Sequence, residues 1–422
     1  MFLGLFALVL INVPIAIALA SVGTIALYQD FGAGFLSNVP LNMYDGSTRF
    51  PLIAIPLFVL AGAIMNATGI SQRLIDLASA LLGFIRGGLA MVNIGVSMFF
   101  AEISGSAVAD VSAVGSVLIP AMKRKGYPGA LAVSVTSSSA SLAIIIPPSI
   151  PMILYGVMAQ TSIVQLFIAG VVPGIIGGLG MMILAYIFAR RYNLPIEEGF
   201  QLPRVWTTFK RAGWALTLPV IILGGILGGF VTATEGAGLA VLAATVIGIF
   251  IYRDLSLSGL WEAAINGGVQ TGVVMLLVAS SYVVGSYLTM AGIPREMAAA
   301  ITELTDNKYL ILALLNVFFL MLGMILHSAS AIVLVVPIVM PLVHIVGIDP
   351  VHFGLIVTLN LAIGQQTPPV ASVLMTACAV GRADVWDVTR TNIWFILLLL
   401  GVLILVTYVP VIPMYLVETF YR

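Results

Sequence analysis

The chain has 422 residues, of which 61% are hydrophobic and 8% are charged, with a mean hydropathy of +1.15 and a formal net charge of zero. Soluble domains carry about 25% charged residues, so this composition excludes a soluble protein, and the neutral balance argues against a nucleic-acid partner. We expect an all-α polytopic protein of the lipid bilayer, because helices satisfy their backbone hydrogen bonds internally. The single cysteine, Cys378, allows no intrachain disulfide.

Membrane spans are predicted wherever the chain is apolar for long enough to cross about 30 Å of hydrocarbon. In chain order these runs are 2–28, 51–68, 128–160, 164–189, 214–231, 235–252, 268–291, 350–380 and 392–416. Amphipathic segments at 71–85 and 294–306 are expected to lie in the two membrane interfaces. Further interfacial helices are expected at 203–212 and 256–266.

Two longer stretches, 88–125 and 309–345, have room for two passes each and carry small polar residues at their centres. We interpret both as re-entrant helical hairpins, which enter and leave the membrane by the same face. Irregular backbone at such a tip is tolerated only where protein or a water-filled cavity surrounds it. The tips are therefore predicted to border protein or a cavity.

The chain repeats its proline and glycine pattern at a constant shift of 221 residues. The first-half positions and their second-half counterparts are Pro120, Gly126, Pro147 and Pro148, then Pro341, Gly347, Pro368 and Pro369. We expect two repeats, 1–212 and 213–422, each with scaffold helices, one hairpin and one proline-broken helix (128–160 and 350–380). Paired broken segments are typical of secondary transporters whose site lies at the repeat interface.

The basic residues predict the orientation of the chain. With the ends of the 88–125 hairpin on the cytoplasmic side, thirteen of the seventeen Lys and Arg residues lie inside, and four lie outside, namely Arg49, Arg295, Lys308 and Arg422. This asymmetry agrees with the positive-inside rule. The first hairpin then opens inward and the second outward, so the two repeats are inverted and the C-terminus lies outside.

Two polar motifs of the first repeat interrupt apolar runs. Glu102–Ser106 with Asp110 places carboxylates at membrane depth, where they are costly and usually functional; tight packing of small residues is the alternative reading. Ser137–Ser141 precedes Pro147–Ser149, whose proline pair is expected to break a helix. The carbonyl end of a broken helix suits Na+ and its N–H end suits an anion. A structural kink is the alternative here.

The second repeat has counterparts at His327–Ser330 and Gly364–Pro369. The glutamines and threonine of the latter run are costly inside an apolar segment unless ions, water or substrate satisfy them. His327 can bond substrate, carry a proton or serve as a packing residue, and a single histidine leaves these roles open. Glu235, at the start of a span, is expected to cap its own helix. The sequence has no HExxH, GxSxG or Walker A motif, so an enzyme is not expected.

In these motifs and their order the chain resembles the large membrane subunit (M, DctM-like) of tripartite ATP-independent periplasmic (TRAP) transporters. The matching motifs span nearly the whole chain and are Ile55–Phe58 with Gly62, Gly69–Ser71, Glu102–Ser106 with Asp110, Gly126–Pro128, Pro147–Ser149, Thr232–Glu235 and Gln366–Pro369. Ala233 departs from the proline expected in many members. The resemblance implies a bacterial inner-membrane protein with a divalent-anion/Na+ symporter-like elevator fold, in which a transport domain moves against a scaffold.

The resemblance also implies two protein partners, a small four-helix membrane subunit (Q type) and a periplasmic substrate-binding protein (P type). The implied activity is Na+-coupled import of a small organic acid, of the sialic acid or C4-dicarboxylate type, with two or more Na+ ions. A stand-alone Na+/organic-anion symporter is the alternative, although such symporters often carry Ser-Asn-Thr at the hairpin tips, where this chain has Ser104-Gly105-Ser106. An intramembrane enzyme or a channel fits the sequence less well.

Carried over to this chain, the resemblance implies two Na+ sites with substrate between them. One Na+ site would use Ser104, Ser106, Ser138, Ser139 and Ser141. Its inverted mate would use Ser328, Ser330, Gly364 and Thr367. Substrate would lie near Asp110, Ser149, His327 and Gln366.

Overall fold

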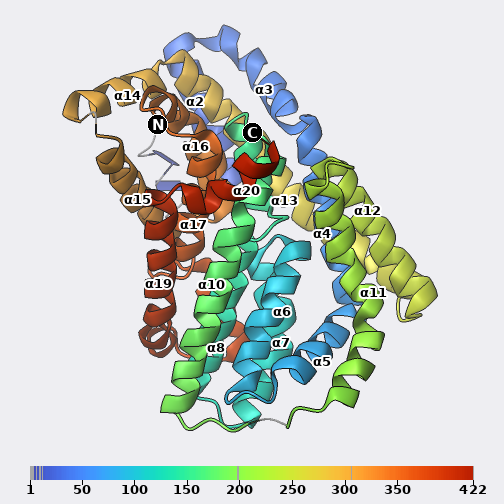
Figure 1. Cartoon of the computed structure of the whole chain (residues 1–422). Coiled ribbons are helices and arrows are strands. Elements are labelled where there is room, and N and C mark those ends of the chain that lie inside the picture. The colour runs from blue at the N-terminus through green and yellow to red at the C-terminus, as the bar shows by residue number, and fades with distance from the viewer. Residues whose placement is uncertain are drawn as a thin grey trace.

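A computed structural model describes residues 4, 5, 7, 8, 11, 13–196, 199–305 and 307–421, without the side chains of 102–104 and 304. The described chain is helical almost throughout (Figure 1). Its first half contains α2 (Ile15–Phe31), η1 (Ala33–Ser37), α3 (Asn38–Ser47), η2 (Phe50–Ile53), α4 (Ala54–Ala67), α5 (Ile70–Leu82), α6 (Gly88–Ser104), α7 (Ala107–Arg124), α8 (Gly129–Ala140), η3 (Ser141–Ile144), α9 (Ile150–Met158) and α10 (Ile163–Arg191).

The second half continues with the same kind of element. It contains α11 (Leu202–Leu227), α12 (Ala233–Val246), the π-helical turn η4 (Ile247–Ile251), α13 (Leu257–Met290), α14 (Ile293–Leu304), α15 (Lys308–Ile325), α16 (Ser328–Ile345), α17 (Pro350–Gly364), α18 (Ser372–Gly381), α19 (Val385–Tyr408) and α20 (Val411–Tyr421). Eight of the described helices are long and apolar enough to cross a membrane. The predicted all-α polytopic class is confirmed.

Both predicted hairpins and both predicted broken helices are present. α6 and α7 form the first hairpin and α15 and α16 the second. The first broken helix runs from α8 through η3 to α9, and the second from α17 to α18. Each break contains its proline pair, Pro147-Pro148 or Pro368-Pro369, with a cis peptide bond in both. Proline has no N–H to donate and cannot continue the helix, which is why both helices stop there.

Contacts between distant segments define two opposite faces. Lys123 Nζ, near the end of α7, donates to the carbonyl of Gly381 at the end of α18. We call this side the α6 face, because α6 begins and α7 ends there. Lys308 Nζ donates to the carbonyl of Gly347 at 3.1 Å and joins the two ends of the second hairpin on the other side, which we call the α15 face. The Gly87 N–H, at the start of α6, donates to the Pro195 carbonyl just after α10 at 3.1 Å. In Figure 1 this end of α10 lies at the bottom and α14, which precedes α15, lies at the top, so the hairpins open on opposite faces.

The amphipathic arms and one helix cap agree with the sequence-based expectations. α5 and α14 occupy the two segments predicted to precede the hairpins. Glu235 caps α12, since its carboxylate accepts the Thr232 N–H at 2.8 Å while the Thr232 hydroxyl accepts the Glu235 N–H at 3.2 Å. This reciprocal pair is a capping box, which satisfies two N–H groups that the helix cannot.

Some predicted boundaries are wrong. The segments 203–212 and 256–266 are not separate interfacial helices but the first turns of α11 and α13. No proline separates either segment from the apolar run that follows, so the helix continues and its N–H groups keep their partners. As a result α13 has 34 residues and is about 51 Å long at 1.5 Å per residue. The last predicted span is divided at Pro410, between α19 and α20.

The helices form two packed groups. α2, α3 and α4 pack against α13, and α4 and α11 pack against α12; we call these six helices the scaffold group. The hairpin group consists of both hairpins, both broken helices, α10 and α19, which pack against one another. α5 contacts α11 in the scaffold group and α6 in the hairpin group, and α14 likewise contacts α13 and α16. The two arms therefore connect the groups.

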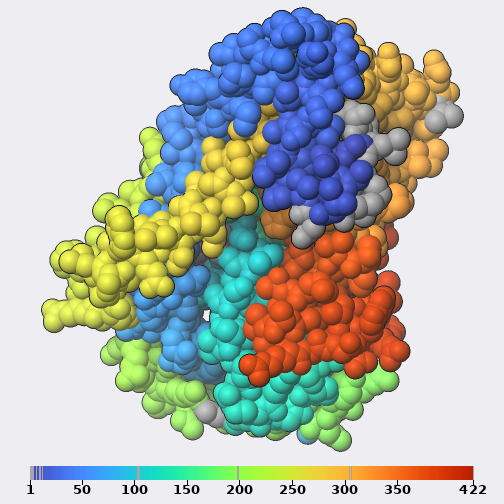
Figure 2. All heavy atoms as spheres, turned by 180° about the vertical axis from the view of Figure 1, so that it is seen from behind, coloured from blue at the N-terminus to red at the C-terminus, as the bar shows by residue number. Residues whose placement is uncertain are grey.

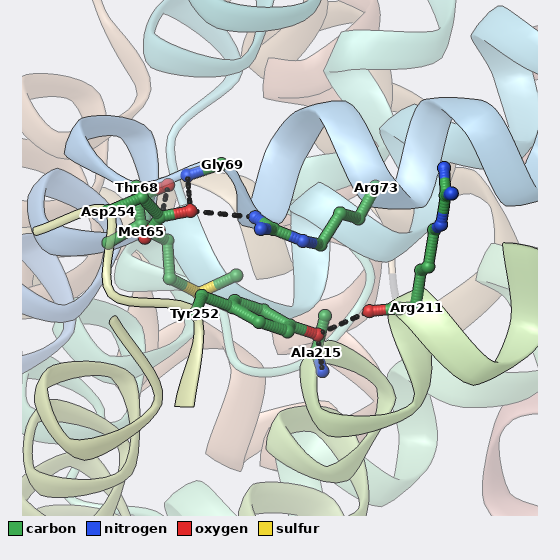
Figure 3. A network of polar contacts seen from close by, with 8 residues as sticks. All are labelled: Met65, Thr68, Gly69, Arg73, Arg211, Ala215, Tyr252 and Asp254. Carbon is green, nitrogen blue, oxygen red and sulfur yellow. Dashed lines mark hydrogen bonds and ion pairs between the residues drawn. The ribbon is translucent and has the colours of Figure 1, made fainter. Parts of the chain in front are cut away.

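A polar network fixes α5 to the scaffold group (Figure 3). The Asp254 carboxylate accepts the Gly69 N–H at 3.0 Å and Arg73 Nη1 at 2.7 Å. The Arg73 guanidinium also lies 3.8 Å from the centroid of the Tyr252 ring. The Tyr252 hydroxyl in turn donates to the carbonyl of Arg211 in α11 at 2.8 Å. A Cβ atom at position 69 would lie 2.7 Å from the carboxylate oxygen, so glycine lets the network form without displacing these side chains.

Arg73→Gln is expected to lower the Tm in detergent, because it removes an ion pair and a cation–π contact worth about 1–2 kcal/mol together. Arg390→Gln serves as the control. Its pair with Asp387 is long, at 3.8 Å, and its side chain is 82% exposed, so the Tm should not change. Equal Tm values for the two variants would contradict the anchoring role of the network.

Candidate functional site

Two adjoining cavities lie where the hairpin tips meet. The smaller, which we call the tip cavity, has a volume of about 70 Å³ and is lined by Val59, Gly105, Ser106, Ala107, Ile144, Ile150, Pro151, Gln270, Val274, His327, Ser328, Ala329 and Gln365. The larger, which we call the vestibule, has a volume of about 870 Å³ and is lined by Asn66, Ser71, Ser106, Val108, Ala109, Ser112, Ala113, Ser116, Val117, Val269, Gln270, Val273, Val274 and His327.

The vestibule extends from the first hairpin tip toward the α6 face. Its wall follows α7 from Ser106 to Val117 and includes Asn66 and Ser71, which flank the start of α5. Figure 2 shows the molecule from behind, with the surface hollowed between the yellow α13 and the cyan α7. The described residues that line the vestibule include no Asp, Glu, Lys or Arg. Hydroxyl and amide groups and the His327 imidazole therefore provide its polarity.

Three helices begin at the tip cavity. Ala107, Ile150 and Ser328 are the first residues of α7, α9 and α16, and all three line it. The first N–H groups of a helix lack intrahelical partners, and the helix dipole places roughly half a positive charge at that end. Three such ends around one cavity of uncharged side chains favour an anionic ligand.

The first hairpin tip contacts the first broken helix closely. Gly105 adopts φ of 55°, and a Cβ atom there would lie 3.2 Å from the Pro148 carbonyl oxygen. Only glycine combines this left-handed backbone with so close an approach. Ser106 follows as the cap of α7, and its Oγ accepts the Ala109 N–H at 3.5 Å. The side chain of Ser104, predicted as a Na+ ligand, lies outside the described residues.

The two broken helices are joined by buried side chains. Gln366, from the second break, donates through Nε2 to Ser141 Oγ at 2.6 Å, and its Oε1 lies 2.8 Å from Ser138 Oγ. Asn392, from α19, completes the cluster, with its Oδ1 2.7 Å from Ser138 Oγ and its Nδ2 3.3 Å from Gln366 Oε1. All four residues are fully buried. The structure thus brings three predicted site residues together, but they bond one another behind the cavity wall.

A second buried polar cluster lies between α6, α7 and α8. Ser139 Oγ donates to Ser97 Oγ at 3.0 Å and lies 3.4 Å from Asn93 Oδ1. Asp110, on α7, is fully buried, and both its carboxylate oxygens lack a hydrogen-bond partner. Sequence reasoning missed Asn93 and Ser97, although their spacing of four residues places both polar groups on one face of α6.

The predicted residues of the second Na+ site surround the second hairpin tip. Ser328 and Ser330 are buried in the first turn of α16. Gly364 ends α17 against the other arm of the hairpin, where a Cβ atom would lie 2.9 Å from the Met324 N. The Thr367 hydroxyl donates to the Ile363 carbonyl at 3.0 Å. Close backbone packing therefore requires glycine at position 364.

The cavity wall itself differs in part from the predicted substrate site. His327 lines both cavities, as expected of a substrate residue. Ser149 is fully buried and donates to the Ile144 carbonyl at 2.8 Å. Gln365, rather than Gln366, lines the tip cavity, and its Nε2 is buried without a partner. Gln270, from α13, was not identified from the sequence, although it is an isolated amide in a long apolar span.

Neighbouring glutamines give a matched pair of variants. Gln366→Ala should lower the Tm by removing the buried hydrogen bonds that Gln366 makes with Ser138, Ser141 and Asn392, a loss of about 1–3 kcal/mol. Gln365→Ala should leave the Tm nearly unchanged and impair ligand binding, since this amide faces the cavity. Thermal unfolding in detergent measures the first effect and a transport assay the second. A larger loss of Tm in Gln365→Ala than in Gln366→Ala would contradict the placement of Gln365 at the cavity and Gln366 in the buried cluster.

Comparison with known proteins agrees with this architecture. The family model described as "Tripartite ATP-independent periplasmic transporter, DctM component" matches residues 2–412. The crystal structure of the Alcanivorax borkumensis YdaH transporter superposes with a TM-score of 0.64 at 14% identity, over 90% of this chain and 89% of that one. At this identity the likeness shows the fold alone.

Curated relatives carry names of the same transporter class. The isethionate TRAP transporter permease protein DctMQ of Oleidesulfovibrio alaskensis is 39% identical over 98% of this chain, which spans 65% of that relative. The C4-dicarboxylate large permease protein DctM of Pseudomonas aeruginosa is 38% identical, over 91% of this chain and 90% of the relative. The sialic acid permease protein SiaT of Haemophilus influenzae is 35% identical over 86% of this chain and 59% of its own length. The chain therefore belongs to the DctM family of TRAP transporter large permeases.

Proposed function

We propose that the chain carries out Na+-coupled import of a small organic acid by an elevator movement of the hairpin group against the scaffold group. The observation that carries this proposal is the convergence of three helix N-termini on the tip cavity. Unpaired N–H groups bind carboxylate or sulfonate oxygens without a basic side chain. The ligand therefore needs an acidic group.

Names of the relatives support this substrate class. Isethionate, C4-dicarboxylates and sialic acid differ in shape but share an anionic acid group. In our proposal that group lies at the helix N-termini, with His327, Gln270 and Gln365 contacting the rest of the molecule. Ser149 and Gln366 then shape the site from behind the wall, where Asp110 is available to bind Na+. Which of these acids is carried depends on the side chains around the vestibule.

Buried oxygen atoms near both tips fit Na+. The Asp110 carboxylate and Ser137 Oγ near the first tip, and Asn360 Oδ1 in α17, are buried without hydrogen-bond partners. Hard cations prefer oxygen ligands, and the carbonyl ends of interrupted helices supply more of them. We propose one Na+ near Ser104, Ser106 and Ser138–Ser141, and one near Ser328, Ser330, Gly364 and Thr367. Their charge offsets the desolvation of an anion held at membrane depth.

The charge asymmetry of the chain supports a cytoplasmic α6 face, since thirteen basic residues lie on that side and four on the other. Together with the position of the vestibule it supports an inward-facing conformation. The vestibule then opens to the cytoplasm, and the C-terminal end lies in the periplasm of a bacterial inner-membrane protein. We propose that the periplasmic binding protein docks on the α15 face and that the small four-helix subunit packs on the scaffold group. A stand-alone symporter is the second candidate.

Reconstitution in proteoliposomes tests the function. The chain, its small membrane subunit and its binding protein should take up labelled succinate or N-acetylneuraminate only under an inward Na+ gradient. Omission of either the gradient or the binding protein should abolish uptake. Uptake that persists without the binding protein would contradict the tripartite proposal and favour the stand-alone symporter.

Two substitutions test the first Na+ site. Ser106→Ala and Asp110→Ala should each abolish uptake while the amount of folded protein, judged by size-exclusion chromatography, stays the same. Each substitution removes a side-chain oxygen that we propose binds the first Na+, so the ion should no longer bind. Ser37→Ala is the control, because that hydroxyl is exposed and donates to the nearby Gly34 carbonyl at 3.0 Å, away from both cavities. Normal uptake by both site variants would refute the assignment.

A further inference from the structure

We propose that a second organic-anion site lies beside Arg49 on the α15 face, and that substrate occupies it before it enters the tip cavity. This inference rests on the proposed function. The observation behind it is a cavity of about 360 Å³, a size typical of small-molecule sites. We call it the Arg49 cavity.

The polar groups of the Arg49 cavity favour an anion. Arg49 is the one charged side chain among the described residues that line it. The guanidinium lies 5.1 Å from the centroid of the Tyr282 ring, which supports it from one side. No carboxylate of the described chain lies within ion-pair distance of Arg49, so its donors are available to a ligand. Guanidinium groups bind carboxylates in a two-pronged geometry.

Two amides add further donors. Asn42 lines the cavity, and its Nδ2 is buried without a hydrogen-bond partner. Gln160 lines the opposite wall, in the left-handed backbone conformation with φ of 52°. A buried amide hydrogen without an acceptor costs about 1–3 kcal/mol, and an anionic oxygen would satisfy it. Among the described residues, the cavity thus combines one cation and one unsatisfied amide donor with a second amide, and no acid lines it.

The position of the Arg49 cavity places it on the substrate path. Asn42, Arg49 and Tyr282 belong to the scaffold side, whereas Val157 and Val333 come from α9 and α16 of the hairpin group. Both α9 and α16 begin at the tip cavity and run from it toward the α15 face. Along α13, Ser281 in the Arg49 cavity lies eleven residues after Gln270 in the tip cavity, or about 16 Å. The two sites therefore follow one another across the membrane.

The separation of the two sites explains why the cation is not in the tip cavity itself. Arg49 attracts an anion from the periplasmic side, where a fixed charge raises the local concentration of substrate. The tip cavity binds the anion through neutral donors, and in our proposal its affinity for the anion depends on bound Na+. A permanent cation there would retain substrate after Na+ had left. A site that spans both helix groups also changes shape when they move, which releases the anion onward.

A cysteine-protection experiment tests the inference without relying on transport. In a Cys378→Ala background, Ser286→Cys places a thiol in the Arg49 cavity, and its reaction with a maleimide is timed in phosphatidylcholine vesicles, which contain no anionic lipid. Succinate, isethionate and N-acetylneuraminate are the probes. At least one should slow labelling, and Arg49→Gln should raise the concentration needed by about tenfold. Arg49→Lys should have a smaller effect. Protection by none of the probes, or protection unchanged in Arg49→Gln, would overturn the site.

Uptake measurements separate this inference from the proposed function. Arg49→Gln should raise KM by about tenfold with little change in kcat, because it weakens capture and leaves the tip cavity intact. Arg295→Gln removes another positive charge of the same face outside the cavity and should leave KM unchanged. Equal KM changes in both variants would overturn a specific site at Arg49. Failure of the wild type to take up any acid, with Arg49-dependent protection intact, would instead refute the transport function alone.

Discussion

Every backbone N–H and C=O group at membrane depth needs a partner, and the architecture of this protein follows from that requirement. Hairpins and broken helices create free helix ends inside the membrane, and the surrounding helices must enclose them. α7, α9 and α16 begin at one small cavity. The positive ends of three helices therefore share a space from which lipid is excluded. An arrangement that is unfavourable when empty is, for the same reason, favourable for an anion.

The two breaks are linked, because Gln366 bonds two serines that lie 228 and 225 residues earlier in the chain. The four fully buried side chains of this cluster satisfy one another. Movement of one broken helix without the other would separate buried donors from their acceptors. The cluster therefore favours displacement of the hairpin group as a rigid body. Anchoring of α5 to the scaffold group through Arg73 and Asp254 would give such a body a fixed point to move against.

Hairpins and breaks were predictable because proline, glycine and hydrophobicity mark them directly. Which side chains line the cavity was harder to predict. Within a break the backbone follows no regular period, so Gln365 and Gln366 are indistinguishable in the sequence although one faces the cavity and the other the core. Gln270 and Arg49 come from the scaffold, far in sequence from the repeated motifs. The extension of α11 and α13 through their polar first turns shows that amphipathic composition does not end a helix.

The length of α13 has a consequence for the membrane around the protein. Its 34 residues span about 51 Å, whereas the hydrocarbon core of a bilayer is about 30 Å thick. The helix must tilt, extend into the headgroup region or thicken the nearby lipid, and each of these changes with acyl-chain length. α2, α3, α4 and α16 all pack on this helix. Bilayer thickness should therefore influence the tilt of the scaffold helices. We expect the rate at which the protein functions to differ between thin and thick membranes.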